Sequence, residues 1–214
     1  MKLTDKYDLF IFDFDGTIAN TLPLYFESFR KVISSFNNED FDDSEIESWF
    51  GPNEVGILKE RLNNITDLPN AEKMLYSVYE SDHEALVKTD KDIFLMLNKL
   101  KKQRKFIAMV TGKCKKTYDY SSKALMLDQT FQYEITGDDV EKPKPSSEGL
   151  VKVIKHFQVS NDRAIYIGDS DMDVKAAREA KIDSVAVTWF NKEKNFKEQY
   201  TYLSFSPLDL LEEM

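Results

Sequence analysis

Two aspartates stand directly after an apolar stretch near the start of the chain. Residues 7–21 read YDLFIFDFDGTIANT, in which the apolar run 9–12 is typical of a buried strand. A buried carboxylate is costly unless it is paired, hydrogen-bonded or bound to a metal. Asp13 and Asp15 are two residues apart and point the same way on an extended backbone, and Gly16 allows a sharp turn after them. We therefore expect both acids at the mouth of a site that needs negative charge.

Three later segments also run into residues that suit a charged site. They supply Thr111, Gly112 and Lys113 (TGK), Lys142 and Lys144 (EKPKP), and Asp169 and Asp173 (GDSDMD). Asp173 follows Asp169 by one helical turn and can face the same side. In open parallel sheets, ligands bind beyond the carboxyl ends of the strands. The four segments therefore predict one shared site at that edge of a sheet.

The acids are suited to bind a cation, whereas the other residues are suited to bind an anion. Bringing Asp13, Asp15 and Asp169 together is unfavourable without a cation, and a hard divalent ion such as Mg²⁺ prefers oxygen ligands. Thr111 offers a hydroxyl, and Gly112 lets its backbone N–H approach a ligand closely. Neutral donors opposite a metal–carboxylate cluster are typical of a site for a phosphoryl group.

One lysine is expected to complete the anion-binding side. Lys142 precedes Pro143, and a residue before proline is held extended because the helical region is disfavoured there. We assign the cation to Lys142 and expect Lys144 to be a solvated neighbour. The lysines that follow the second apolar run are expected to be solvated surface residues: Lys113, Lys115 and Lys116.

The elements that position these residues can be read from the hydrophobic pattern. Strands are expected at 106–110, 132–136, 163–170 and 183–189, and helices at 92–100, 146–157 and 173–181. Short apolar runs that alternate with amphipathic helices indicate a parallel sheet covered on both faces. The predicted fold class is α/β, a doubly wound parallel sheet with a small inserted helical domain.

The chain divides into two kinds of sequence. From residue 22 to about 88 the apolar residues recur at helical spacing, with no strand pattern. Because this helical stretch follows the first strand, it is best explained as an insertion into the sheet domain. We expect residues 1–18 and 89–214 to form the α/β catalytic core, and residues 19–88 the helical cap.

Composition limits the possible partners and location. The 214 residues carry 29 Lys and Arg against 38 Asp and Glu, a net charge of −9. This acidic balance lacks the basic footprint of a nucleic-acid binder and would be repelled by anionic membranes. A single cysteine, Cys114, allows no internal disulfide, and no apolar run approaches the ~20 residues of a membrane span. We expect a cytoplasmic protein; its oligomeric state is not readable.

The four motifs together resemble those of one known family. DFDGT, TGK, KPKP and GDSDMD are similar, in type and order, to the four motifs of the haloacid dehalogenase superfamily. The resemblance covers the chain from Asp13 to Asp173. One large subgroup of that family carries a helical cap between the first two motifs, where this chain has its helical stretch.

The resemblance implies a role for each site residue. Asp13 would be the nucleophile that forms an aspartyl-phosphate, and Asp15 the general acid and then the general base. Mg²⁺ would be held by Asp13, the backbone carbonyl of Asp15, and Asp169. Asp173 would lie behind them and hold Lys142 or a metal-bound water. The implied phosphate-binding residues are Thr111, Gly112 and Lys142.

Differences among the family's branches narrow the function. Asp15 favours phosphoryl transfer over dehalogenation, which needs no acid there. Mutases of the β-phosphoglucomutase type place an arginine in the cap loop, where this chain has Asn53 and Glu54, whereas phosphoglycolate phosphatases often show a Gly-Pro loop like that at 51–52. The sequence thus favours a Mg²⁺-dependent phosphatase of a small phosphorylated metabolite. The alternatives are a sugar phosphomutase and a non-hydrolytic, phosphorylatable regulatory or binding domain.

Overall fold

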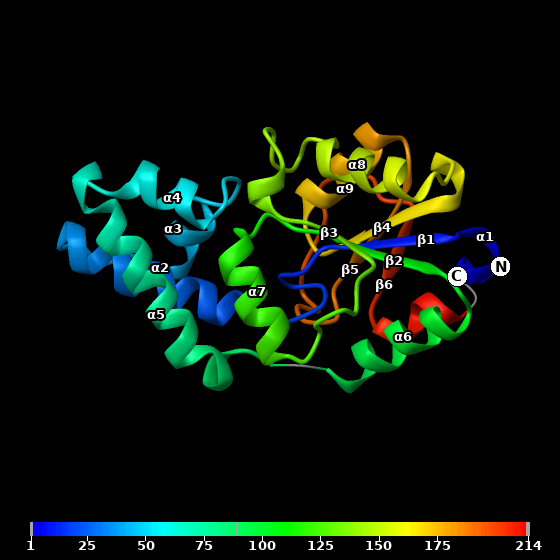
Figure 1. Ribbon diagram of the computed structural model, residues 1–214, viewed down its shortest axis with the longest axis horizontal. Helices are drawn as coiled ribbons and strands as arrows, with labels where there is room; N and C mark the ends of the chain where they lie inside the picture. Colours follow the sequence, from blue (N-terminus) through cyan, green and yellow to red (C-terminus); the bar gives the residue numbers. More distant parts are fainter. Residues whose placement is uncertain (1, 89, 213–214) are drawn as a thin grey trace.

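A six-stranded parallel sheet forms the centre of the α/β part of the molecule. The computed structural model describes residues 2–88 and 90–212, and its sheet has the order β3-β2-β1-β4-β5-β6 (Figure 1). The strands are β1 Leu9–Phe12, β2 Phe106–Val110, β3 Tyr133–Ile135, β4 Ala164–Gly168, β5 Asp183–Val187 and β6 Tyr202–Ser204. Each pair of neighbours is parallel. This arrangement confirms the predicted fold class.

Helices cover both faces of the sheet. They are α6 Lys91–Lys102, α7 Lys115–Ala124, α8 Glu148–Phe157 and α9 Asp171–Ala180. Alternate residues of β1 enter separate cores, because successive side chains of a strand point to opposite faces. Leu9 and Ile11 pack with α8 and α9, whereas Phe10 and Phe12 pack on the face that carries α6. Figure 1 shows α8 and α9 on one side of the sheet and α6 on the other.

A group of helices lies between β1 and α6 in the sequence and to one side of the sheet in space (Figure 1). Its helices are α2 Leu22–Asn37, α3 Asp43–Glu47, α4 Glu54–Arg61 and α5 Leu68–Leu86. We call residues 22–86 the helical region. Its long helices α2 and α5 pack against each other, and the predicted apolar positions Leu24, Phe29 and Val32 are buried.

Helix α7, strand β6 and the short helix α1 Leu3–Lys6 were not expected from the sequence. Helix α7 has the polar sequence KKTYDYSSKA, and strand β6 has only three residues, so neither shows a clear hydrophobic period. The predicted domain limits include residues 1, 89, 213 and 214, which lie outside the described residues. None of the helices in the described part of the chain is long and apolar enough to cross a membrane.

The central strand should be the part of the core most sensitive to truncation. Ile11 is 0% exposed and lies between β2 and β4, whereas Leu95 on α6 is 43% exposed. We expect Ile11→Ala to lower the free energy of unfolding by about 2–5 kcal/mol, through lost burial and a cavity. Leu95→Ala should change it by only about 0.5 kcal/mol. Urea denaturation followed by circular dichroism measures both, and equal losses would contradict this placement of the core.

Candidate active site

Three neighbouring strands bring the predicted site residues to one pocket. In the sheet register, Phe12 at the end of β1 is paired with Met109 of β2 and Ile167 of β4. Polar residues follow each of these strands and line one pocket of about 380 Å³; they include Asp13, Asp15, Thr111, Gly112 and Asp169. The sequence was therefore right to place these residues together at the carboxyl edge of the sheet.

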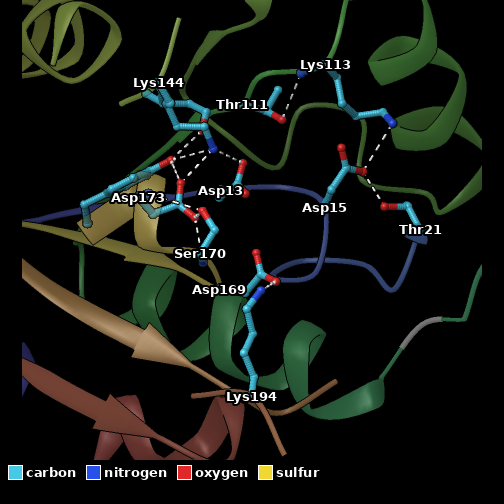
Figure 2. Close-up of polar contacts among 12 residues, drawn as sticks. Asp13, Asp15, Thr21, Thr111, Lys113, Lys144, Asp169, Ser170, Asp173 and Lys194 are labelled. Carbon is cyan, nitrogen blue, oxygen red and sulfur yellow. Dashed lines mark hydrogen bonds and ion pairs between the residues drawn. The ribbon is translucent and has the colours of Figure 1, made fainter. Parts of the chain in front are cut away.

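Three carboxylates form the centre of this site (Figure 2). Asp13, Asp169 and Asp173 each offer one oxygen, and these oxygens lie within 4.8 Å of one another. Burial raises the pKa of Asp13 to about 8, with a further contribution from the neighbouring acids. Burial also raises the pKa of Asp169. An all-oxygen cluster in which Asp13 and Asp169 resist ionisation fits a hard divalent cation, because a bound ion would favour their charged forms.

The turn after Asp15 depends on glycine. Gly16 has a φ of +75°, a conformation that side chains other than glycine rarely adopt. A Cβ added to Gly16 would lie 2.5 Å from Oδ2 of Asp169, so the missing side chain also makes room for that acid. The indole N–H of Trp189 donates a hydrogen bond of 2.8 Å to the carbonyl oxygen of Thr17. The loop of the first motif therefore lies against Asp169 at the end of β4, and the hydrogen bond from Trp189 joins it to the segment after β5.

The lysine that enters the site is Lys144, and the prediction of Lys142 was wrong. Lys144 Nζ lies 2.8 Å from Oδ1 of Asp13 and 2.7 Å from Oδ1 of Asp173, and its side chain is only 12% exposed. The side chain of Lys142 is exposed, and its backbone N–H donates to Glu148. Both lysines precede a proline, so the extended backbone that favoured Lys142 could not distinguish them. Lys144 is also not the solvated neighbour that the sequence suggested.

Asp173 accepts a hydrogen bond from Lys144 and is itself held by other donors. Its Oδ1 accepts hydrogen bonds from Lys144 and from the hydroxyl of Tyr166, at 2.7 and 3.0 Å, and its Oδ2 accepts from the backbone N–H of Ser170 at 3.0 Å. Burial alone would raise the pKa of Asp173, but the Lys144 ammonium and these hydrogen bonds hold it below its ordinary value. Gly168 leaves room for the carboxylate, because an added Cβ would lie 2.4 Å from Cγ of Asp173.

Thr111 and Gly112 border the same pocket from β2. Thr111 is buried, and its backbone N–H donates to the carbonyl oxygen of Ile135 in the next strand at 3.0 Å. This bond fixes the end of β2. A Cβ added to Gly112 would meet no heavy atom within 4 Å, so the backbone of Gly112 faces open space on the pocket side.

Two further lysines belong to the site, and the sequence did not identify either of them. Lys113 was expected on the surface, but its side chain is fully buried and its Nζ lies 3.2 Å from Oδ1 of Asp15. Lys194 lies between β5 and β6, and its Nζ is 2.8 Å from Oδ2 of Asp169. The segment around Lys194 has no strand or helix pattern, so only the folded chain could reveal its position.

Comparison with known proteins agrees with this geometry. The sequence model of the family described as haloacid dehalogenase-like hydrolase matches residues 10–187. Pyrophosphatase PpaX of Bacillus mycoides is 29% identical over 198 residues, which cover 91% of this chain and 90% of that protein.

Two solved structures show how widely the fold is shared. The structure of a predicted phosphoglycolate phosphatase from Haemophilus somnus matches with a TM-score of 0.83 at 19% identity, covering 96% of each chain. CbbY from Rhodobacter sphaeroides, solved in complex with phosphate, matches with a TM-score of 0.80 at 18% identity, covering 97% of this chain and 100% of that one. At these identities the two structures support the fold alone.

The raised pKa of Asp13 has a measurable effect on stability. Asp13 holds its proton more tightly in the folded chain than in the unfolded chain, where its pKa is near 4. The free energy of unfolding of the metal-free protein should therefore fall as the pH rises from about 4 to about 8. Asp13→Asn cannot ionise, so its free energy of unfolding should change less between pH 5 and pH 8 than that of the wild-type protein.

Urea denaturation in EDTA at pH 5 and pH 8 measures this difference. Identical pH slopes for the two proteins would show that burial does not raise the pKa of Asp13. Added Mg²⁺ should stabilise the wild-type protein more than Asp13→Asn, because a bound ion favours the ionised carboxylate.

Proposed function

Because this chain belongs to the haloacid dehalogenase-like hydrolases, we propose that it is a phosphatase that hydrolyses a small phosphate monoester. The observation that carries the proposal is the meeting of opposite charges in one pocket. Asp13 belongs to a carboxylate cluster with Asp169 and Asp173, and the ammonium of Lys144 lies 2.8 Å from its Oδ1. Such a site suits a phosphoryl group, which needs both a nucleophile and positive charge around its oxygens.

The acids are arranged to hold a divalent cation. Asp13 and Asp169 would supply carboxylate oxygens and Asp15 its backbone carbonyl, with Asp173 beside them. When bound, Mg²⁺ would offset the repulsion between the ester and the carboxylate of Asp13.

In the first step, the carboxylate of Asp13 attacks phosphorus and the bond to the leaving alcohol breaks. Lys144 and the hydroxyl of Thr111 stabilise the charge on the phosphoryl oxygens. Asp15, protonated, gives its proton to the leaving oxygen, so that the alcohol departs neutral. The product is an alcohol and a phosphoryl group bound to Asp13.

In the second step, Asp15 takes a proton from water as the water oxygen attacks phosphorus. The bond between Asp13 and phosphorus breaks, inorganic phosphate leaves, and both aspartates return to their starting forms. Asp15 can act first as an acid and then as a base because the alcohol leaves phosphorus in the first step, and water attacks from the same position in the second.

The helical region is proposed to act as a cap. Leu22, Tyr25, Phe50 and Glu54 line the pocket together with the residues at the strand ends. A cap that covers the site would exclude bulk water during the first step and select substrates by shape. The volume of about 380 Å³ favours a small ester. This proposal adopts the sequence-based division into a core and a cap of residues 19–88.

Glu54 supports a phosphatase rather than a mutase. It occupies the part of the cap loop where mutases of the β-phosphoglucomutase type carry an arginine. Its carboxylate is fully buried and accepts hydrogen bonds of 2.6 Å from the backbone N–H of Cys114 and the hydroxyl of Thr117. Its oxygens are taken by these donors and by Lys113 Nζ at 3.4 Å, so Glu54 offers no positive charge to bind a second phosphate. The relation to a protein named as a pyrophosphatase also supports hydrolysis.

The assignment of the nucleophile is tested by Asp13→Asn. The amide cannot attack phosphorus as a carboxylate does, so we expect phosphate release from p-nitrophenyl phosphate with Mg²⁺ to fall by more than about 1,000-fold. The variant should keep the circular dichroism spectrum of the wild-type protein. Undiminished turnover would show that another residue accepts the phosphoryl group.

The two lysines of EKPKP provide a matched pair of variants. Lys144→Met removes the ammonium beside Asp13, and we expect kcat/KM to fall by about 100-fold or more. Lys142→Met changes an exposed residue in the same loop and should leave kcat/KM within about twofold. Steady-state kinetics with p-nitrophenyl phosphate measures both. A larger loss for Lys142→Met would mean that the other lysine binds the phosphoryl group.

A further inference from the structure

Lys113 is a buried cation that the two chemical steps above do not use. Its side chain is fully buried, and a buried ammonium is costly unless its N–H groups find acceptors. Three oxygens lie close to Nζ: the hydroxyl of Tyr79 at 3.0 Å, Oδ1 of Asp15 at 3.2 Å and Oε1 of Glu54 at 3.4 Å. An ammonium has three donors, so these three oxygens match it in number.

These partners come from both parts of the molecule. Asp15 follows β1 in the core, whereas Glu54 begins α4 and Tyr79 lies on α5 of the helical region. The rings of Tyr79 and Tyr25 also lie near Nζ, at 4.9 and 5.7 Å from the ring centroids, where cation–π attraction favours a desolvated cation. The ammonium is therefore held in place from the helical region and turned toward Asp15.

The carboxylate of Glu54 accepts hydrogen bonds from residues at the start of α7. The hydrogen bonds from the Cys114 N–H and the Thr117 hydroxyl use both of its carboxylate oxygens. Glu54 thus joins the helical region to the segment that carries Lys113. The same carboxylate lies 3.4 Å from Lys113 Nζ, so its hydrogen bonds from Cys114 and Thr117 fix one of the oxygens that surround the ammonium.

Among the described residues, both polar contacts of the Asp15 side chain fall on one oxygen. Lys113 approaches Oδ1, and the hydroxyl of Thr21 donates a hydrogen bond to the same atom (Figure 2). An ammonium has donors only, so Oδ1 cannot carry a proton toward it. When Asp15 is protonated, the proton must sit on the other oxygen, Oδ2. That oxygen is left for the substrate in the pocket that Asp15 lines.

We propose that Lys113 is a positioning residue for Asp15, held by Glu54 and Tyr79 so that the acidic proton of Asp15 faces the leaving oxygen of the ester. This inference rests on the proposed function, in which Asp15 protonates the alcohol. Lys113 neither gains nor loses a proton in the reaction. It fixes which oxygen of Asp15 acts, and it does so only when the helical region is docked.

The dependence of the rate on the leaving group tests the proposal. Alkyl phosphates need a proton on the departing oxygen, whereas 4-nitrophenolate departs without one. The constant kcat/KM reports steps up to departure of the leaving group, so the later hydrolysis of the phosphoryl group does not mask the effect. We expect Lys113→Met to lower kcat/KM for glycerol phosphate by about tenfold or more, and that for 4-nitrophenyl phosphate by less than about threefold.

Lys115→Met is the matched control, because Lys115 is exposed at the start of α7 and pairs with Asp119. It should change neither rate constant. Asp15→Asn is the reference for the proposed function and should show the same selective loss as Lys113→Met, but a larger one. If Asp15→Asn is not selective, the role of Asp15 is wrong. If Asp15→Asn is selective and Lys113→Met lowers both rates equally or neither, the role of Lys113 is overturned.

A variant without the ammonium leaves Glu54 and Asp15 with less compensation, and circular dichroism shows whether it still folds. If it does not, Tyr79→Phe decides the matter, because it removes only the hydroxyl that accepts from Lys113. A loss of kcat/KM for glycerol phosphate that exceeds the loss for 4-nitrophenyl phosphate supports the proposal. Equal losses for the two esters would overturn it.

Discussion

The repulsion between carboxylates gathered at the carboxyl edge of the sheet is the constraint on which this site depends. Five acids take part, and three lysines from separate segments lie against them. The acids are Asp13, Asp15, Glu54, Asp169 and Asp173, and the lysines are Lys113, Lys144 and Lys194. With all five acids ionised, they exceed the lysines by two charges. A divalent cation is the addition that brings this group of side chains closest to neutrality.

Lys144 and Lys113 lie in two different parts of the site. Lys144 lies between Asp13 and Asp173, where the phosphoryl group is proposed to bind, and Lys113 lies with Asp15 at the border with the helical region. This separation places Asp13 and Asp15 in different electrostatic surroundings, although they are only two residues apart. It supports the proposal that these two carboxylates have two different roles.

Much of the fold and part of the site follow from local sequence patterns. The buried run before Asp13, the later strands and the helix that follows Asp169 were predicted because apolar periodicity reflects which faces are covered. The site acids were predicted because a carboxylate at the end of a buried strand is costly unless it is paired, hydrogen-bonded or bound to a metal. Periodicity gave no signal for α7, whose sequence is mostly polar, or for the short β6.

The cations could not be assigned from the sequence because their surroundings come from distant parts of the chain. Lys142 and Lys144 both precede a proline, and the contacts of Lys144 with Asp13, Tyr166 and Asp173 distinguish them. Lys113 is buried by residues of α4 and α5, which no pattern near position 113 reveals. Lysine positions of this kind are set by tertiary packing, whereas the strand-end acids are set by local structure.

A crystal structure of the protein with Mg²⁺ and orthovanadate tests the central claim most directly, since vanadate imitates the phosphoryl group during transfer. The account predicts one Mg²⁺ ion bound by carboxylate oxygens of both Asp13 and Asp169, with vanadium next to the other oxygen of Asp13 and Lys144 Nζ on a vanadate oxygen. An ion bound elsewhere, or vanadate contacted by Lys142 while Lys144 turns to solvent, would contradict it.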